Sequence, residues 1–289
     1  MPFSAIKRIA PFLFLFAALV SIANALPRAS NVPGGVAIVN LGAFDPLQEK
    51  PFAWFRGQPV WVSKQGQQWV AVVGLPLNLP VGIHELRVSN QGESGIAFRH
   101  TSFEVHAKHY PAQHITLKDT SRITLSEANR LRASAEIERI RKLRHHWHAV
   151  PNLEPRFAPP VQGRLTGRFG VRRFFNGEER NPHNGLDIAV PLGTPVKAMA
   201  DGVVIDTGDY FFNGKTVFID HGNGLISMVC HLDRIDVQTG ETVALGQKIG
   251  LAGMTGRASG PHVHLSVILN GTMVDPELFV DAALPSSAN

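Results

Sequence analysis

The chain has 289 residues, of which 44% are hydrophobic and 18% are charged. This composition is that of a globular protein and excludes an intrinsically disordered one, and the length allows two domains with a linker. The net charge of +5 is not concentrated in a basic stripe within one domain, which argues against a nucleic-acid-binding protein.

The first 25 residues have the pattern of a secretory signal peptide. Lys7 and Arg8 precede an apolar run from Ile9 to Ile22, and Ala23-Asn24-Ala25 follows as a small-x-small cleavage site. The run is shorter than the ~20 residues of a membrane-spanning helix, and Pro11 interrupts it. We therefore expect an exported or periplasmic protein that keeps no transmembrane segment once residues 1–25 are removed. Its net charge then falls from +5 to +3, because only Lys7 and Arg8 are lost.

Residues 26–117 consist of short β segments separated by turn residues. The segments are GVAIVNL, PVWVSK, QWVAVVGLPL and GIHELRVSN, with predicted turns at residues 80–82 and 90–92. Several short strands at this spacing predict a small β-sandwich. We expect this N-terminal β domain to be regulatory or wall-binding.

Residues 118–160 form a predicted helical and proline-rich linker. Thr124 and Glu127 have capping-box spacing, and apolar residues then recur at helical intervals, which predicts a helix of about six turns. The helix should end before Pro151, because the residue preceding a proline is disfavoured in the helical region. The stretch PNLEPRFAPP then continues as a stiff linker.

Residues 161–280 again show a pattern of strands and turns, and residues 281–289 form a short tail. Turns are predicted at Asn213-Gly214, at residues 221–224 and at Asn270-Gly271, and Asn-Gly between apolar runs is a strong hairpin signal. The predicted fold is therefore mainly antiparallel β, with one long helix outside it.

The stretch SGPHVHLSVIL, residues 259–269, places two histidines on one strand. Because side chains of a strand alternate between its faces, His262 and His264 share a face with Ser266, while Val263 and Leu265 point to the core. An isolated His-x-His pair is more often a solvated strand face than a functional site. It becomes informative only if other parts of the chain supply partners.

Partners are available in the same half of the chain. His183 precedes Asp187 by four residues with Gly185 between them, and His231 closes the strand LISMVCHL. Two neutral histidines and one carboxylate form a catalytic zinc set, because three protein ligands leave a fourth position for water. The remaining histidines could serve as proton acceptors. Cys230, the only cysteine, points away from His231 by alternation and is interpreted as a small buried hydrophobe.

The C-terminal half resembles the lysostaphin-type zinc metallopeptidases, which cut peptide bonds in bacterial peptidoglycan. The resemblance covers roughly residues 161–280 and rests on FGVRRFFNGEERNPHNGLDIAVPLGTPVKAMADGVV, GLISMVCHLDRIDVQTGETVALGQKIGLAGMTGRASGPHVHLSV and LNGTMVDPELF. The stretch WVAVVGLPLNLPVGIHELRV also resembles the β domain that precedes the peptidase in a Gram-negative branch of that family.

This resemblance implies a peptidase domain with an active-site groove and one zinc ion per chain. The implied zinc ligands are His183, Asp187 and His264, and the implied catalytic residues are His231 and His262. A zinc-bound water would be the nucleophile and His262 the general base, while His231 would either hold the water or stabilise the tetrahedral intermediate. Val229 departs from the family pattern, since relatives often carry an aromatic residue there.

We therefore expect a metalloendopeptidase that hydrolyses the peptide stems of peptidoglycan, with a regulatory or inhibitory protein as a further partner. The Gram-negative-like N-terminal domain favours a D-Ala to diaminopimelate cross-link over a glycine bridge. One alternative is a catalytically inactive relative that binds the cell wall or activates an amidase, but all five site residues are present. The other alternative is a secreted general protease. An N-terminal domain that plugs the active site is a further hypothesis.

Overall fold

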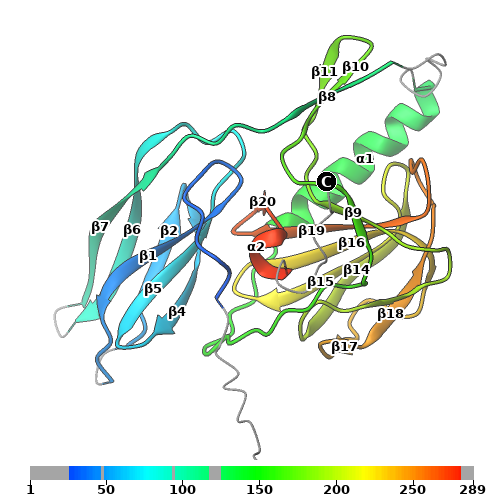
Figure 1. Ribbon diagram of the computed structural model, residues 1–289. Coiled ribbons are helices and arrows are strands. Elements are labelled where there is room, and N and C mark those ends of the chain that lie inside the picture. Colours follow the sequence, from blue (N-terminus) through cyan, green and yellow to red (C-terminus); the bar gives the residue numbers. More distant parts are fainter. Residues whose placement is uncertain (1–25, 47–48, 93–94, 117–124, 281–289) are drawn as a thin grey trace, which may run out of the picture.

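The computed structural model describes residues 26–46, 49–92, 95–116 and 125–280, and its architecture is mainly β (Figure 1). A β-sandwich stands beside a large antiparallel sheet from the C-terminal half, and one long helix lies against that sheet. The predicted fold class is confirmed. The predicted signal peptide and the tail, residues 281–289, lie outside the described residues. Nowhere in the described part of the chain is a helix long and apolar enough to cross a membrane.

The N-terminal sandwich consists of two antiparallel sheets. In spatial order, one contains β1 (Val36–Ala43), β5 (Gln68–Gly74) and β4 (Trp61–Gln65), and the other contains β3 (Gln58–Pro59), β2 (Phe52–Phe55), β6 (Gly82–Gly92) and β7 (Gly95–Val105). The turn predicted at residues 90–92 is wrong, because β6 continues through them and pairs with β7 as far as Gly92 and Gly95.

Alternation along β1 shows why the first sheet is buried on both faces. Ala37, Val39 and Leu41 enter the core between the two sheets, whereas Val36 belongs to the core of the C-terminal half. The sandwich is thereby attached to the rest of the molecule through its own first sheet.

The long helix α1 (Glu127–Arg144) begins after the predicted cap. Ser126 is the N-cap, and its hydroxyl accepts a hydrogen bond from the backbone N–H of Asn129 at 3.3 Å. Thr124, the predicted cap, lies outside the described residues. The helix spans 18 residues, about five turns, and Ile140 and Leu143 pack on the outer face of the large sheet.

The large sheet forms the centre of the C-terminal half. Its strands are, in spatial order, β17 (Thr242–Val243), β14 (Gly202–Tyr210), β15 (Gly214–Gly222), β16 (Leu225–Ile235), β19 (His262–Leu269), β12 (Leu186–Ala189) and β9 (Arg164–Gly167). Beside this row, β13 (Pro195–Lys197) pairs with β18 (Lys248–Ala252), β20 (Thr272–Val274) pairs with β19, and α2 (Glu277–Val280) follows. All three predicted hairpin turns are present, between β14 and β15, β15 and β16, and β19 and β20.

A small third sheet joins residues from before and after α1. It consists of β11 (Glu178–Arg180), β10 (Arg172–Phe175) and β8 (Ala112–Ile115). The β10 and β8 strands are parallel, and the ring of His114 stacks on that of Phe174. The chain that leaves the sandwich thus pairs with a hairpin of the C-terminal half.

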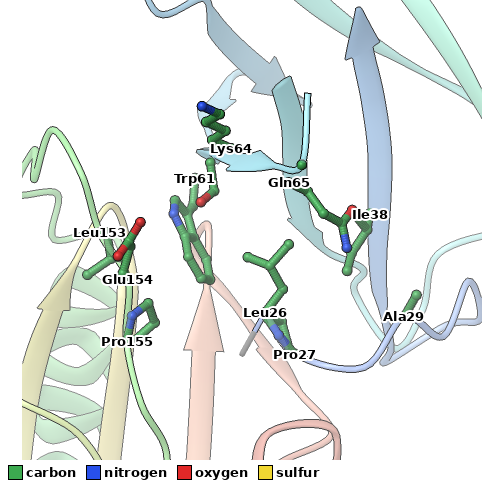
Figure 2. A pocket seen from close by; sticks show the side chains of 12 residues that line it. Leu26, Pro27, Ala29, Ile38, Trp61, Lys64, Gln65, Leu153, Glu154 and Pro155 are labelled. Atoms are coloured by element: carbon green, nitrogen blue, oxygen red, sulfur yellow. The ribbon is translucent and has the colours of Figure 1, made fainter. Parts of the chain in front are cut away.

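The sandwich and the large sheet share one hydrophobic core. Trp61 and Val72 of the sandwich belong to the same buried cluster as Leu269. Asn270 adds two hydrogen bonds, since its Oδ1 accepts from the Gly74 N–H at 2.6 Å and its Nδ2 donates to the Gly74 carbonyl at 3.1 Å. A cavity of about 510 Å³ lies beside this junction, and Figure 2 shows Trp61 among the side chains that line it.

Candidate active site

Three adjacent strands of the large sheet hold four of the five predicted site residues. Asp187 lies on β12, His262 and His264 on β19, and His231 on β16, while His183 lies in the loop before β12. Asp187 pairs directly with His264 across the two strands. The structure therefore brings all five predicted residues to one place.

Three donor atoms converge at this place. The Oδ1 atom of Asp187 lies 3.1 Å from Nε2 of His183 and 2.7 Å from Nδ1 of His264, and these two nitrogens lie 3.2 Å apart. Two imidazole nitrogens and one carboxylate oxygen are the donor set of a catalytic zinc site. Among the described residues, these three form the one group of histidine, cysteine or acidic side chains with this convergence.

The outer nitrogens of both imidazoles are held by hydrogen-bond acceptors. His183 Nδ1–H donates to the Arg168 carbonyl at 2.9 Å. His264 Nε2 lies 2.9 Å from the Ser266 hydroxyl, which itself donates to the Asn184 carbonyl and so accepts from His264. These tautomers leave lone pairs on His183 Nε2 and His264 Nδ1, both directed at a carboxylate. Three electron pairs that meet without a proton between them suit a bound cation.

The electrostatics of Asp187 agree with this assignment. Burial alone would raise the pKa of Asp187, but hydrogen bonds and positive charge from the His183 and His264 rings, when they carry a proton, outweigh it and hold the pKa well below its usual range, as a cation at the same place would. Burial also lowers the pKa of His264. The site therefore presents an ionised carboxylate and a neutral imidazole at neutral pH, which are the protonation states of metal ligands.

Gly185 allows the loop before β12 to approach His264. A Cβ atom at Gly185 would lie 2.5 Å from Nε2 of His264 and 2.4 Å from the Leu265 carbonyl oxygen. Any side chain there would collide with the His264 ring and with the backbone of its strand. The absence of a side chain at residue 185 therefore leaves room for the His264 ring.

A β-bulge directs His231 toward the site. Thr216 on β15 faces two residues of β16, Cys230 and His231, and His231 has a positive φ of 61°. In a regular strand His231 would point away from His264, because the cross-strand neighbour of His264 is Cys230. The bulge turns the His231 ring instead to 4.6 Å from that of His262. Without the bulge, alternation would place the His231 ring on the other face of the sheet.

Both remaining histidines donate one ring N–H to the backbone. Nδ1–H of His231 donates to the Thr255 carbonyl at 2.9 Å, and Nδ1–H of His262 donates to the Gly260 carbonyl at 2.8 Å. Each Nε2 atom therefore carries a lone pair, and that of His262 lies 3.8 Å from Oδ1 of Asp187. Burial lowers the pKa of His231 to about 4, so this ring is neutral at neutral pH. No sequence pattern indicated Thr255 or Gly260 as their partners.

Cys230 is not part of the site. Its side chain is buried in the cluster beneath α1, and burial raises the pKa of its thiol to about 12. The thiol is therefore protonated and unsuited to hold a metal, as its interpretation as a small hydrophobe predicted.

Two descriptions of one known family match this chain. Peptidase family M23 matches residues 181–276, and the peptidase family M23 N-terminal domain matches residues 29–108. A crystal structure of a peptidase M23 from Pseudomonas aeruginosa is 40% identical, and the superposition covers 88% of this chain and 96% of that one with a TM-score of 0.71. The chain belongs to peptidase family M23.

Curated relatives of this M23 peptidase align with part of it. The peptidoglycan DD-endopeptidase ShyA of Vibrio cholerae is 40% identical over 129 residues, which are 45% of this chain and 26% of ShyA. The DD-carboxypeptidase/endopeptidase Mpg of Neisseria meningitidis is 39% identical over 128 residues, which are 44% of this chain and 29% of Mpg. The chain thus matches about a quarter of the length of these relatives. All five site residues lie inside the M23 peptidase match, whereas β10 and β11 precede it.

Proposed function

We propose that this M23 peptidase is a zinc-dependent endopeptidase that hydrolyses the peptide cross-links of peptidoglycan. The observation that carries the proposal is the convergence of His183, Asp187 and His264 beside two further histidines with free Nε2 lone pairs. The names of ShyA and Mpg support peptidoglycan as the substrate. A peptidoglycan hydrolase acts outside the cytoplasm, which agrees with the signal peptide predicted for residues 1–25.

The metal would be held by Nε2 of His183, Oδ1 of Asp187 and Nδ1 of His264. When bound, zinc would polarise the scissile carbonyl and lower the pKa of the water that serves as nucleophile. The carbonyl of Arg168 and the hydroxyl of Ser266 keep both imidazoles in the tautomers that leave these nitrogens free.

His262 is the residue best placed to move the proton. Its Nε2 lone pair faces the ligand carboxylate, and its Nδ1–H is held by the Gly260 carbonyl. We propose that Nε2 accepts the proton of the attacking water and later delivers it to the leaving amine. The hydrogen bond to Gly260 would stabilise the imidazolium that exists between these two steps.

The orientation of His231 favours one of its two expected roles. A neutral ring whose Nδ1–H is already donated to Thr255 has only an acceptor left at Nε2. Such a nitrogen can accept a hydrogen bond from water, whereas an oxyanion needs a donor. We therefore propose that His231 orients the attacking water rather than stabilising the tetrahedral intermediate.

Muropeptide analysis tests this function. We expect the purified protein lacking residues 1–25 to release cross-linked stem peptides from isolated cell walls, and His262→Ala to release about 100-fold less, in line with the loss of a general base. A wild-type protein that yields no new products would overturn the proposal, as would equal products from both proteins. Release of peptides from casein at a comparable rate would instead support the general protease.

Metal content tests the ligand assignment separately. We expect the wild type and His262→Ala to bind one zinc ion per chain, and His183→Ala and Asp187→Ala to bind much less, because each removes one of three ligands. Zinc would be measured by mass spectrometry after dialysis. Full zinc content in His183→Ala would refute the assignment, and full zinc in wild type with no hydrolysis would favour an inactive wall-binding relative.

A further inference from the structure

An arginine on the small third sheet lies beside the ligand carboxylate. Nη2 of Arg173, on β10, is 3.7 Å from Oδ2 of Asp187, the oxygen that does not face the histidines. The Arg173 side chain keeps 32% of its surface exposed. A cation that is open to solvent therefore stands at the edge of the proposed active site.

The other arginines of this hairpin are occupied by glutamates. Arg172 pairs with Glu179 at 2.8 Å, and Arg180 pairs with Glu178 at 2.7 Å. For Arg173, the ion pair with Asp187 is the only one within the described residues, and 3.7 Å is longer than the 2.7–2.9 Å of a charge-assisted hydrogen bond. The guanidinium has unused donors and faces the site, since Arg172 and Phe174 take the opposite face of β10.

The ion pair with Asp187 does not satisfy the charge and the hydrogen-bond donors of the Arg173 guanidinium. In the proposed function the Asp187 carboxylate neutralises a metal ion, which withdraws its charge from Arg173. A second carboxylate with two oxygens would satisfy the planar fork of the guanidinium better than one distant oxygen does. The expected source of that carboxylate is the substrate.

We propose that Arg173 determines specificity by binding a carboxylate of the peptidoglycan cross-link next to the scissile bond. In a cross-link from D-Ala to diaminopimelate, the carbon that bears the scissile nitrogen also bears a free carboxylate. A glycine bridge or an amidated diaminopimelate offers no such charge. Arg173 therefore makes the enzyme prefer the free carboxylate, and this inference rests on the proposed function.

The test compares two enzymes on two substrates. The substrates are muropeptide dimers that differ only in a carboxylate or carboxamide next to the scissile bond, and the enzymes are wild type and Arg173→Gln. We expect wild type to have about 10- to 100-fold higher kcat/KM on the carboxylate. Arg173→Gln should lower the rate on the carboxylate to that on the carboxamide and leave the carboxamide rate unchanged.

Arg180→Gln is the matched control. It removes a positive charge from the same hairpin, directly across from Arg173 in the strand register, so a general electrostatic effect would appear in both variants. We expect Arg180→Gln to keep the wild-type preference. We also expect Arg173→Gln to keep full zinc content, which a role limited to supporting Asp187 would not predict.

Binding provides a readout that is independent of turnover. With His262→Ala in the background, Arg173→Gln should weaken calorimetric binding of the carboxylate dimer by the same factor and leave carboxamide binding unaffected. Equal losses on both substrates, or a wild type without preference, would overturn the inference and leave the proposed function standing. A wild type that cleaves neither dimer would overturn the proposed function and this inference with it.

Discussion

His231 occupies a backbone conformation that side chains disfavour. Its φ of 61° lies in the left-handed region, where L-residues pay about 1–2 kcal/mol. The conformation is held by the β-bulge and by hydrogen bonds from its backbone N–H to Asn213 and from its ring to Thr255. Backbone strain of this kind persists at functional sites when the surrounding structure over-determines it. Here it turns the imidazole toward His262 and His264.

Comparing two substitutions measures this strain. His231→Ala and His231→Gly both lose the imidazole, but only glycine adopts a positive φ without cost. We expect His231→Gly to be more stable than His231→Ala by about 1 kcal/mol in urea unfolding, with hydrolysis impaired in both. Equal stability of the two variants would show that the backbone at this position is not strained.

Only part of the candidate site could be predicted residue by residue from the sequence. The common face of His262 and His264 follows from the period of two, and the structure confirms it. The face of His231 does not follow, because the bulge depends on how β15 pairs with β16. Arg173 was equally inaccessible, since nothing in the order of residues shows that β10 lies beside Asp187.

Among the elements, α1 links the two halves of the chain and also pairs with a buried carboxylate of the large sheet. Arg139 donates from Nε to Oδ2 of Asp206 at 2.8 Å and from Nη2 to Oδ1, and the Tyr210 hydroxyl also donates to this carboxylate. The Asp206 side chain is only 4% exposed. The helix therefore supplies the charge that a buried carboxylate of the large sheet requires.

Removing that charge should destabilise the C-terminal half. We expect Arg139→Met to lower the free energy of unfolding by about 1–3 kcal/mol, because Asp206 is left buried with only Tyr210 as a side-chain donor. Arg141→Met is the matched control, since Arg141 pairs with Glu138 on the exposed surface of the same helix and should cost below about 1 kcal/mol. Equal losses in thermal unfolding would contradict this account.

The first residue of α1 could not be predicted correctly from the sequence pattern. The helical periodicity is confirmed, but the sequence favoured Thr124 as the cap where the structure uses Ser126. Two hydroxyl residues two positions apart give nearly the same local signal. The observed cap is the residue whose hydroxyl accepts from the Asn129 backbone N–H.

For the whole molecule, the junction between sandwich and large sheet is the main unpredicted feature. The two halves share buried residues, and Asn270 binds both backbone groups of Gly74. No local pattern could show this, because the two residues are 196 positions apart. In this arrangement the sandwich contacts the end of β19 remote from the histidines, so plugging the active site would require the shared core to separate.

The contribution of Asn270 to this junction can be measured. Asn270→Gly tolerates the positive φ of 41° and removes only the amide. We expect it to lower the free energy of unfolding by about 1–3 kcal/mol, because the buried N–H and carbonyl of Gly74 lose their partners. Asn213→Gly serves as the control, because Asn213 lies in another Asn-Gly turn and its amide donates to the sulfur atoms of Met228 and Cys230, which are weak acceptors. Urea unfolding that shows equal losses would refute a special role for Asn270.

The number of residues in strand β19 cannot change without moving His264 relative to Asn270. It carries the proposed ligand His264 near one end and is followed by Asn270 at the other, about 20 Å away at 3.3 Å per residue. One residue inserted between them would put His264 and Asn270 out of phase, so either the proposed metal site or the hydrogen bonds to Gly74 would be lost. Two inserted residues would restore the phase but move the sandwich by roughly 7 Å relative to the peptidase. Insertions and deletions should therefore be tolerated in exposed loops that carry no site residue but not among the five residues between His264 and Asn270.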